Sequence, residues 1–129
     1  MLSKWLSLAS GIAGTLLLVS CGSSTGTSYG GGGGGCTPTA TKICTAGGIQ
    51  FSPATLTVAA GTTVTWENGD AVGHTVTSAT GSADTYDMVL ASGTVSHQFA
   101  TAGTYNYYCK IHGINGTPPT GMHGTITVQ

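Results

Sequence analysis

The sequence predicts a small all-β domain, and three observations lead to this fold class. The chain has 129 residues, enough for one domain, and contains 22 glycines but three basic and four acidic residues. Strand and turn formers dominate, whereas good helix formers are scarce beyond the first 20 positions. Short β-type runs alternate with turn residues after Cys36. The low charge also argues against a nucleic-acid-binding protein and against a coiled coil.

The first 35 residues precede the predicted domain. Met1–Ser20 combines Lys4 with an apolar stretch shorter than the ~20 residues that span a bilayer, which indicates a signal peptide. The segment ends in Leu-Val-Ser-Cys21, which resembles a bacterial lipobox, although a chance cysteine at an ordinary cleavage site is the alternative. Residues 21–35 then read as a lipidated cysteine and a flexible Gly/Ser/Thr tether. We expect residues 36–129 to form a domain anchored to the bacterial cell envelope, facing the periplasm or the exterior.

About eight short strands are expected in this domain. Ile49–Phe51, Leu56–Val58 and Val64–Trp66 show alternation with period two, and Ser52-Pro53 and Ala60-Gly61 separate them. The other runs are His74–Thr77, Tyr86–Leu90, Val95–Phe99, Thr104–Tyr108 and Thr125–Val128. Their spacing of roughly 8–12 residues, with glycine-bearing turns, favours a sandwich or barrel. The expected core is Leu56, Val58, Val64, Trp66, Val76, Val95, Phe99, Tyr105, Tyr107, Ile126 and Val128.

The four cysteines are expected to have three different roles. Cys21 is the expected lipid attachment site, and Cys36 and Cys44 lie close enough in sequence to form a disulfide. Cys109 is then left without a partner in an oxidising compartment, where an unpaired thiol usually has a function. It ends a predicted strand, and His112 follows three residues later on an expected loop.

A metal site is predicted from Cys109, His112, Met122 and the upstream His74. Two imidazoles, one thiolate and a weak thioether are the ligands of an electron-transfer copper centre. Zinc prefers four stronger donors, and iron–sulfur clusters need more thiolates than this chain has free. The ligand chemistry therefore selects copper.

Two groups of motifs resemble the plastocyanin-like cupredoxins. The first half of the resemblance comprises Phe51-Ser52-Pro53, Leu56–Val58, Gly61–Asn68 and His74–Ser78. The second half comprises Gly103–Tyr105, Tyr107–Cys109, His112 and Gly121-Met122 with Gly124. This resemblance implies a Greek-key β-sandwich that transfers single electrons between redox proteins. It also implies equatorial copper ligands at His74, Cys109 and His112, and an axial ligand at Met122. The nine residues Gly113–Gly121 form a longer connection than is usual, and we expect it to bulge outward.

Other residues have less specific readings. Met88 is the rival thioether, although packing is the simpler role for it. His97 is expected to be structural and His123 to lie on the surface. Thr75 follows the first histidine where some relatives carry Asn, and its hydroxyl is a candidate hydrogen-bond partner for the site. No catalytic constellation is recognisable, so we expect no enzyme. A copper-binding module for storage or delivery is the alternative function.

The electron is expected to leave through the ring edge of His112. Ile114, Pro118 and Pro119 would form a small apolar docking patch beside it, within apolar surroundings that include Val72 and Ile111. Redox encounters are weak and small in area, so they need no strong charge. We therefore expect a monomer whose association with redox partner proteins depends weakly on salt.

Overall fold

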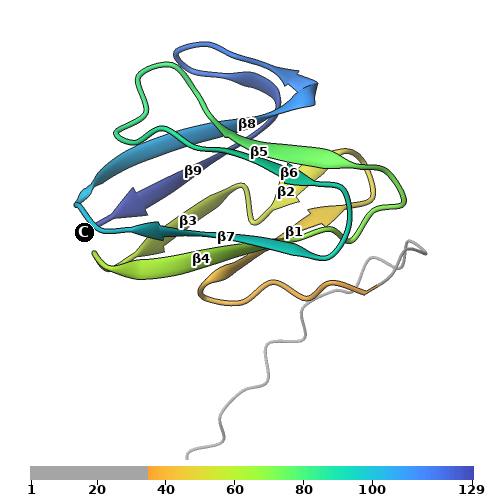
Figure 1. Ribbon diagram of the computed structural model, residues 1–129, viewed down its shortest axis with the longest axis horizontal. Helices are drawn as coiled ribbons and strands as arrows, with labels where there is room; N and C mark the ends of the chain where they lie inside the picture. Colours follow the sequence, from red (N-terminus) through yellow and green to blue (C-terminus); the bar gives the residue numbers. More distant parts are fainter. Residues whose placement is uncertain (1–34) are drawn as a thin grey trace, which may run out of the picture.

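The computed structural model describes residues 35–129, which form nine strands in two sheets (Figure 1). The predicted signal peptide, Cys21 and nearly all of the tether lie outside these residues. The strands are β1 (Lys42–Ala46), β2 (Gln50–Ser52), β3 (Thr55–Val58), β4 (Thr62–Glu67), β5 (His74–Ser78), β6 (Asp87–Leu90), β7 (Thr94–Phe99), β8 (Gly103–Ile114) and β9 (Thr120–Val128). None of the described segments is a helix of the length and apolarity that crossing a bilayer requires.

The two sheets pack face to face as a Greek-key β-sandwich, as predicted. One sheet has the order β2-β1-β4-β7, and the other has the order β3-β9-β8-β5-β6. β1 runs parallel to β4, and β3 runs parallel to β9, while the other pairs are antiparallel. Because β5 and β8 are neighbours, the two segments that carry the predicted ligands lie side by side.

The core lies between the sheets and matches the alternation seen in the sequence. All the predicted core residues are buried except Val95, which is partly buried and packs against the others. Trp66 is fully buried and contacts Tyr107 edge to face, with ring centroids 5.4 Å apart. Such aromatic pairs contribute beyond the area they bury.

β1 was missing from the predicted strands, and its burial pattern explains why. Ile43, Cys44 and Thr45 are all buried, so the strand has no alternation of apolar and polar residues. Cys44 forms a disulfide with Cys36, which ties the start of the described chain to this strand. Cys109 is the free cysteine among residues 35–129, and it is buried.

Candidate metal centre

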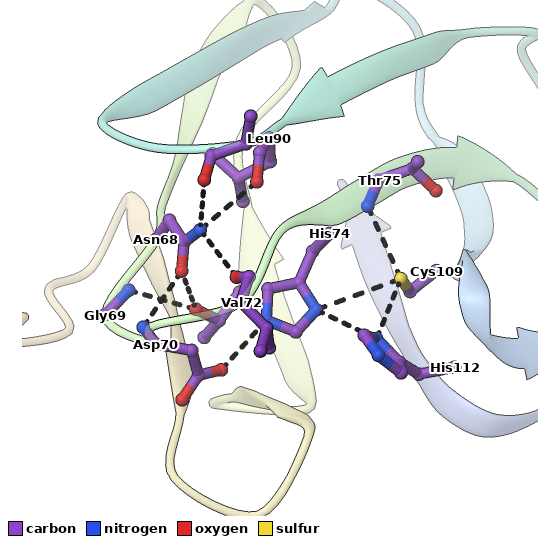
Figure 2. Close-up of polar contacts among 11 residues, drawn as sticks. Asn68, Gly69, Asp70, Val72, His74, Thr75, Leu90, Cys109 and His112 are labelled. Atoms are coloured by element: carbon purple, nitrogen blue, oxygen red, sulfur yellow. Dashed lines mark hydrogen bonds and ion pairs between the residues drawn. The ribbon is translucent and has the colours of Figure 1, made fainter. Parts of the chain in front are cut away.

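Three of the four predicted ligands meet at one end of the sandwich. His74 is the first residue of β5, and Cys109 and His112 lie on β8. The Nδ1 atoms of the two histidines are 3.2 Å apart, and Cys109 Sγ lies 3.9 Å from Nδ1 of His74 and 3.6 Å from Nδ1 of His112. Figure 2 shows the two rings and the sulfur pointing toward one another. Among the described residues, these three form a group able to hold a metal ion.

The expectation that His112 lies on a loop was wrong, because β8 continues to Ile114. Pairing with β9 is interrupted between Tyr108 and Gly113, and it resumes at Gly113↔Gly121 and Ile114↔Thr120. In a regular strand, residues three apart point to opposite faces. A bulge adds unpaired residues and re-aims side chains, so Cys109 and His112 can face the same point. Within the long Gly113–Gly121 connection, the first two and last two residues therefore extend β8 and β9, and the five residues 115–119 form the turn between them.

Two facing glycines allow the backbones to approach closely at this bulge. A Cβ on Gly121 would lie 2.7 Å from the carbonyl oxygen of His112, and the residue has φ of 73°. A Cβ on Gly113 would lie 2.7 Å from the carbonyl oxygen of Met122. Both separations are below those that real Cβ atoms tolerate, so each position requires glycine.

Met122, the predicted axial ligand, lies on β9 and is 2% exposed. Its neighbours Gly121 and His123 pair with Gly113 and Tyr108, so its backbone lies opposite the bulge. It belongs to the hydrophobic core, and its ligation of a metal stays a prediction. The rival thioether, Met88 on β6, is partly buried and packs against the same core.

Thr75 connects the two ligand-bearing strands. Its backbone N–H points to Cys109 Sγ at 3.4 Å, and its hydroxyl accepts a hydrogen bond of 2.8 Å from the backbone N–H of Lys110. The hydroxyl also lies 3.0 Å from that of Thr77, which donates to Asp87. A hydrogen bond to the sulfur and a fixed backbone beside it both restrict the position of the Cys109 side chain.

Asp70 contacts the His74 ring, and the sequence reasoning did not single it out. His74 Nε2 lies 2.9 Å from Asp70 Oδ2, and the side chains are 0% and 10% exposed. Burial lowers the pKa of His74, while the hydrogen bond and the negative charge of Asp70 act in the opposite direction. The available signal was an acidic residue four positions before a candidate ligand, in a chain with four acidic residues.

Asn68 organises the loop that carries Asp70 and leads into β5 (Figure 2). Its Nδ2 lies 2.9–3.2 Å from the carbonyl oxygens of Val72, Leu90 and Ala91. Its Oδ1 accepts hydrogen bonds of 2.9 Å from the Asp70 backbone N–H and the Thr45 hydroxyl. One side chain thereby joins the loop to β1 and to the end of β6.

The residues predicted to form the docking patch are at least partly exposed, with one correction. His112 is half-buried, Ile111 and Ile114 are 61% and 70% exposed, and Pro118 is also exposed. Pro119 is buried and therefore cannot belong to a docking surface.

Two other histidines lie away from this cluster. His97 on β7 packs against Tyr86 and Phe99 and lies 2.9 Å from Asp84 Oδ2, which fits the structural role predicted for it. His123 is exposed, as predicted.

The donor chemistry of the cluster fits copper. Two nitrogens and one sulfur converge from a mostly buried position, with a thioether-bearing strand beside them. Imidazole and thiolate in this ratio, without a fourth strong donor in the group, suit a copper electron-transfer site better than structural zinc.

Comparisons with known proteins agree with this chemistry. Residues 39–129 match the model of the copper-binding proteins of the plastocyanin/azurin family. Plastocyanin from Scenedesmus fuscus is 38% identical over 93 residues, which cover 64% of this chain and 90% of the relative. Chloroplastic plastocyanin from Tetradesmus obliquus is 32% identical, and the match covers 64% of this chain and 61% of that relative.

Solved structures show the same fold. A purple cupredoxin from Nitrosopumilus maritimus is 28% identical with a TM-score of 0.53, covering 68% of this chain and 98% of that one. An amicyanin mutant in its oxidized state is 28% identical with a TM-score of 0.56, covering 68% of this chain and 80% of that one. A copper-containing nitrite reductase from Thermus scotoductus, at 24% identity and a TM-score of 0.58, shares the fold alone and matches 23% of that chain.

Proposed function

Because the chain belongs to the plastocyanin/azurin family of copper-binding proteins, we propose that it carries single electrons between larger redox proteins. One observation carries the proposal: Nδ1 of His74, Nδ1 of His112 and Sγ of Cys109 all lie within 4.8 Å of one another. Copper bound there supplies the Cu(II)/Cu(I) couple, which accepts one electron from a donor and returns it to an acceptor.

In this proposal His74, Cys109 and His112 would hold the copper ion, and Met122 would add a weak fourth donor. The contribution of the protein is to hold these donors still. His74 is fixed through Asp70, and Cys109 is fixed by the Thr75 N–H. A donor set that moves little suits both oxidation states, so little rearrangement accompanies each electron transfer.

The electron would pass through the half-buried His112 ring at an apolar docking patch. We define this patch by His112, Ile111, Ile114 and Pro118, which are all at least partly exposed. Both described lysines form ion pairs, Lys42 with Glu67 and Lys110 with Asp87. Docking would then depend on apolar contact rather than on charge, with a weak dependence of the rate on salt.

The carrier is proposed to be a monomer that a lipid on Cys21 holds at the bacterial cell envelope. The test is to express the full chain and its Cys21→Ala variant in a bacterium and to separate membranes from the soluble fraction. Sedimentation with the membranes only when Cys21 is present supports the anchor. Equal distribution of the two proteins contradicts it.

An optical spectrum of the copper-loaded, oxidised protein tests the electron-carrier proposal. An intense visible thiolate-to-copper band is expected, and Cys109→Ser should abolish it. Met122→Ala should change the colour and the reduction potential with little loss of copper; if neither changes, the axial ligand is elsewhere. A colourless protein that binds only Cu(I) would instead support storage or delivery.

Electron self-exchange tests the docking patch without an identified partner. The rate between oxidised and reduced copies is measured by NMR line broadening in mixed samples. Ile114→Lys should slow the exchange, because it places a charge where two copies meet. Thr101→Lys is the matched control, since it adds the same charge to an exposed turn that precedes β8, at the opposite end of that strand from the ligands. Equal rates in the two variants would contradict the patch.

A further inference from the structure

The contact between His74 and Asp70 has features beyond those of a surface ion pair. Nε2 and Oδ2 are 2.9 Å apart, the imidazole is fully buried, and the carboxylate is 10% exposed. The ring nitrogen that faces Cys109 and His112 is the other one, Nδ1. Nδ1 therefore faces the metal cluster, and Nε2, on the opposite side of the ring, contacts Asp70 (Figure 2).

This contact determines which nitrogen carries the proton. An ionised carboxylate can only accept hydrogen bonds, so Nε2 must donate to it. In the neutral imidazole, Nδ1 then holds the lone pair and faces the cluster in the form that binds a metal. A histidine whose second nitrogen is hydrogen-bonded to a carboxylate is also a stronger electron donor to its metal.

Asp70 is itself held in place. Its backbone N–H donates to Asn68 Oδ1 at 2.9 Å, and Asn68 is joined to three further backbone carbonyls. The backbone that carries the carboxylate is therefore fixed beside the ring, which favours one orientation of His74.

No lysine balances the charge of Asp70 within residues 35–129. Lys42 pairs with Glu67, and Lys110 pairs with Asp87. His112 has no comparable carboxylate partner among the described residues, so the site is asymmetric. A negative charge close to a metal favours the more highly charged ion, here Cu(II) over Cu(I).

We propose that Asp70 is a positioning residue that fixes the tautomer and orientation of His74 and lowers the reduction potential of the copper centre. The inference rests on the proposed ligand role of His74. Beyond that role, it proposes that the Asp70 side chain determines how strongly Cu(II) is favoured over Cu(I).

The first test compares two variants with a matched control. Asp70→Asn keeps the size and one acceptor oxygen but removes the charge, whereas Asp70→Ala removes both. Asp84→Asn is the control, because Asp84 Oδ2 also lies 2.9 Å from a histidine Nε2, that of His97 on β7 in the other sheet. The measurements are the reduction potential by redox titration, the visible spectrum, and the melting temperature of the copper-free protein.

Asp70→Asn is expected to lower the preference for Cu(II) over Cu(I) by about tenfold. A tenfold change corresponds to a rise in potential of about 59 mV for one electron. Asp70→Ala should in addition weaken the binding of Cu(I) and of Cu(II) by roughly tenfold each, because the His74 ring is no longer oriented. Asp84→Asn should leave the potential and both affinities unchanged. A shift in the Asp70 variants no larger than in the control would overturn the proposal, as would a lower melting temperature with an unchanged potential.

The second test uses the unmodified copper-free protein and needs no variant to fold. The nitrogen chemical shifts of His74, assigned by NMR, report which ring nitrogen is protonated. The proposal expects the proton on Nε2, and a proton on Nδ1 would contradict it. The two inferences can fail separately. If Cys109→Ser loses the charge-transfer band but Asp70→Asn has an unchanged potential, the electron-carrier proposal is supported and the proposed role of Asp70 is contradicted.

Discussion

The two walls of the metal centre are built by different physical means. The first wall, residues 68–75, is held by side-chain hydrogen bonds that converge on Asn68 and Asp70. The second wall, the bulged part of β8 with the facing part of β9, is held by backbone pairing and by two glycines. The first wall encloses a fully buried histidine, and the second presents a half-buried one. In the proposed electron carrier, the buried ligand is shielded from water and the half-buried one lies where a partner protein would dock.

Removing the hydrogen bonds of the first wall should have the largest effect on the free energy of unfolding. Asn68→Ala leaves the carbonyls of Val72, Leu90 and Ala91 without their shared donor and frees the Asp70 backbone. The Asn68 amide can donate two hydrogen bonds and its Oδ1 accepts two, so at about 1 kcal/mol for each we expect the free energy of unfolding to fall by about 4 kcal/mol. Urea unfolding of the copper-free protein measures it. A loss below about 1 kcal/mol would mean that Asn68 does not hold the wall together.

A substitution that disrupts the bulge in β8 should lower the free energy of unfolding somewhat less, but it should displace the ligand His112 more directly. Gly121→Ala brings a Cβ to 2.7 Å from the His112 carbonyl oxygen at a φ of 73°, so we expect a loss of about 2 kcal/mol and an altered visible spectrum. Gly61→Ala is the matched control, because Gly61 has φ of 86° with nothing within 4 Å. It should cost about 1 kcal/mol from φ alone and leave the spectrum unchanged.

Equal losses of stability in the two glycine variants would show that the close approach adds no strain. An unchanged spectrum in Gly121→Ala would show that the bulge does not set the position of His112.

The two walls also differ in how far the sequence predicts them. The donor types at His74, Cys109 and His112 were recognisable, because two imidazoles and a thiolate select a metal wherever the chain places them. Their convergence through a bulge was not recognisable, since alternation with period two describes only regular strands. Asp70 was missed because its role depends on the shape of a loop, which no periodicity reports. Pro119 was misplaced on the surface because the burial of a turn residue depends on tertiary structure, which no sequence pattern reports.

The outer end of the second wall is the hairpin turn, residues 115–119, between β8 and β9. The hairpin turn is joined to the connection after β5 by two polar contacts. The Thr80 N–H donates to Asn115 Oδ1 at 2.8 Å, and the Thr117 hydroxyl donates to the Thr80 carbonyl at 3.0 Å. Asn115→Ala should cost about 1 kcal/mol in urea unfolding and leave the copper spectrum unchanged, because the pairing at Gly113↔Gly121 lies between the turn and the ligands. A spectral change would show that the turn helps to position His112.

The smallest expected effect concerns the ion pair that joins the strands behind the site. Asp87 contacts Lys110 and Thr77, and the hydrogen bond from Lys110, followed by that from Thr77, lowers the pKa of Asp87 from its ordinary value. A carboxylate with a lowered pKa in the folded state stabilises the protein above its unfolded pKa, and this stabilisation is lost as the pH falls through the folded value. Asp87→Asn should therefore cost a few tenths of a kcal/mol at pH 7, as exposed ion pairs typically do, and the difference from wild type should shrink below about pH 4. Urea unfolding at pH 7 and pH 3, in a double-mutant cycle with Lys110→Met, measures the coupling. A coupling that persists undiminished at pH 3 would mean that packing of the Lys110 side chain, rather than its charge, ties the two strands together.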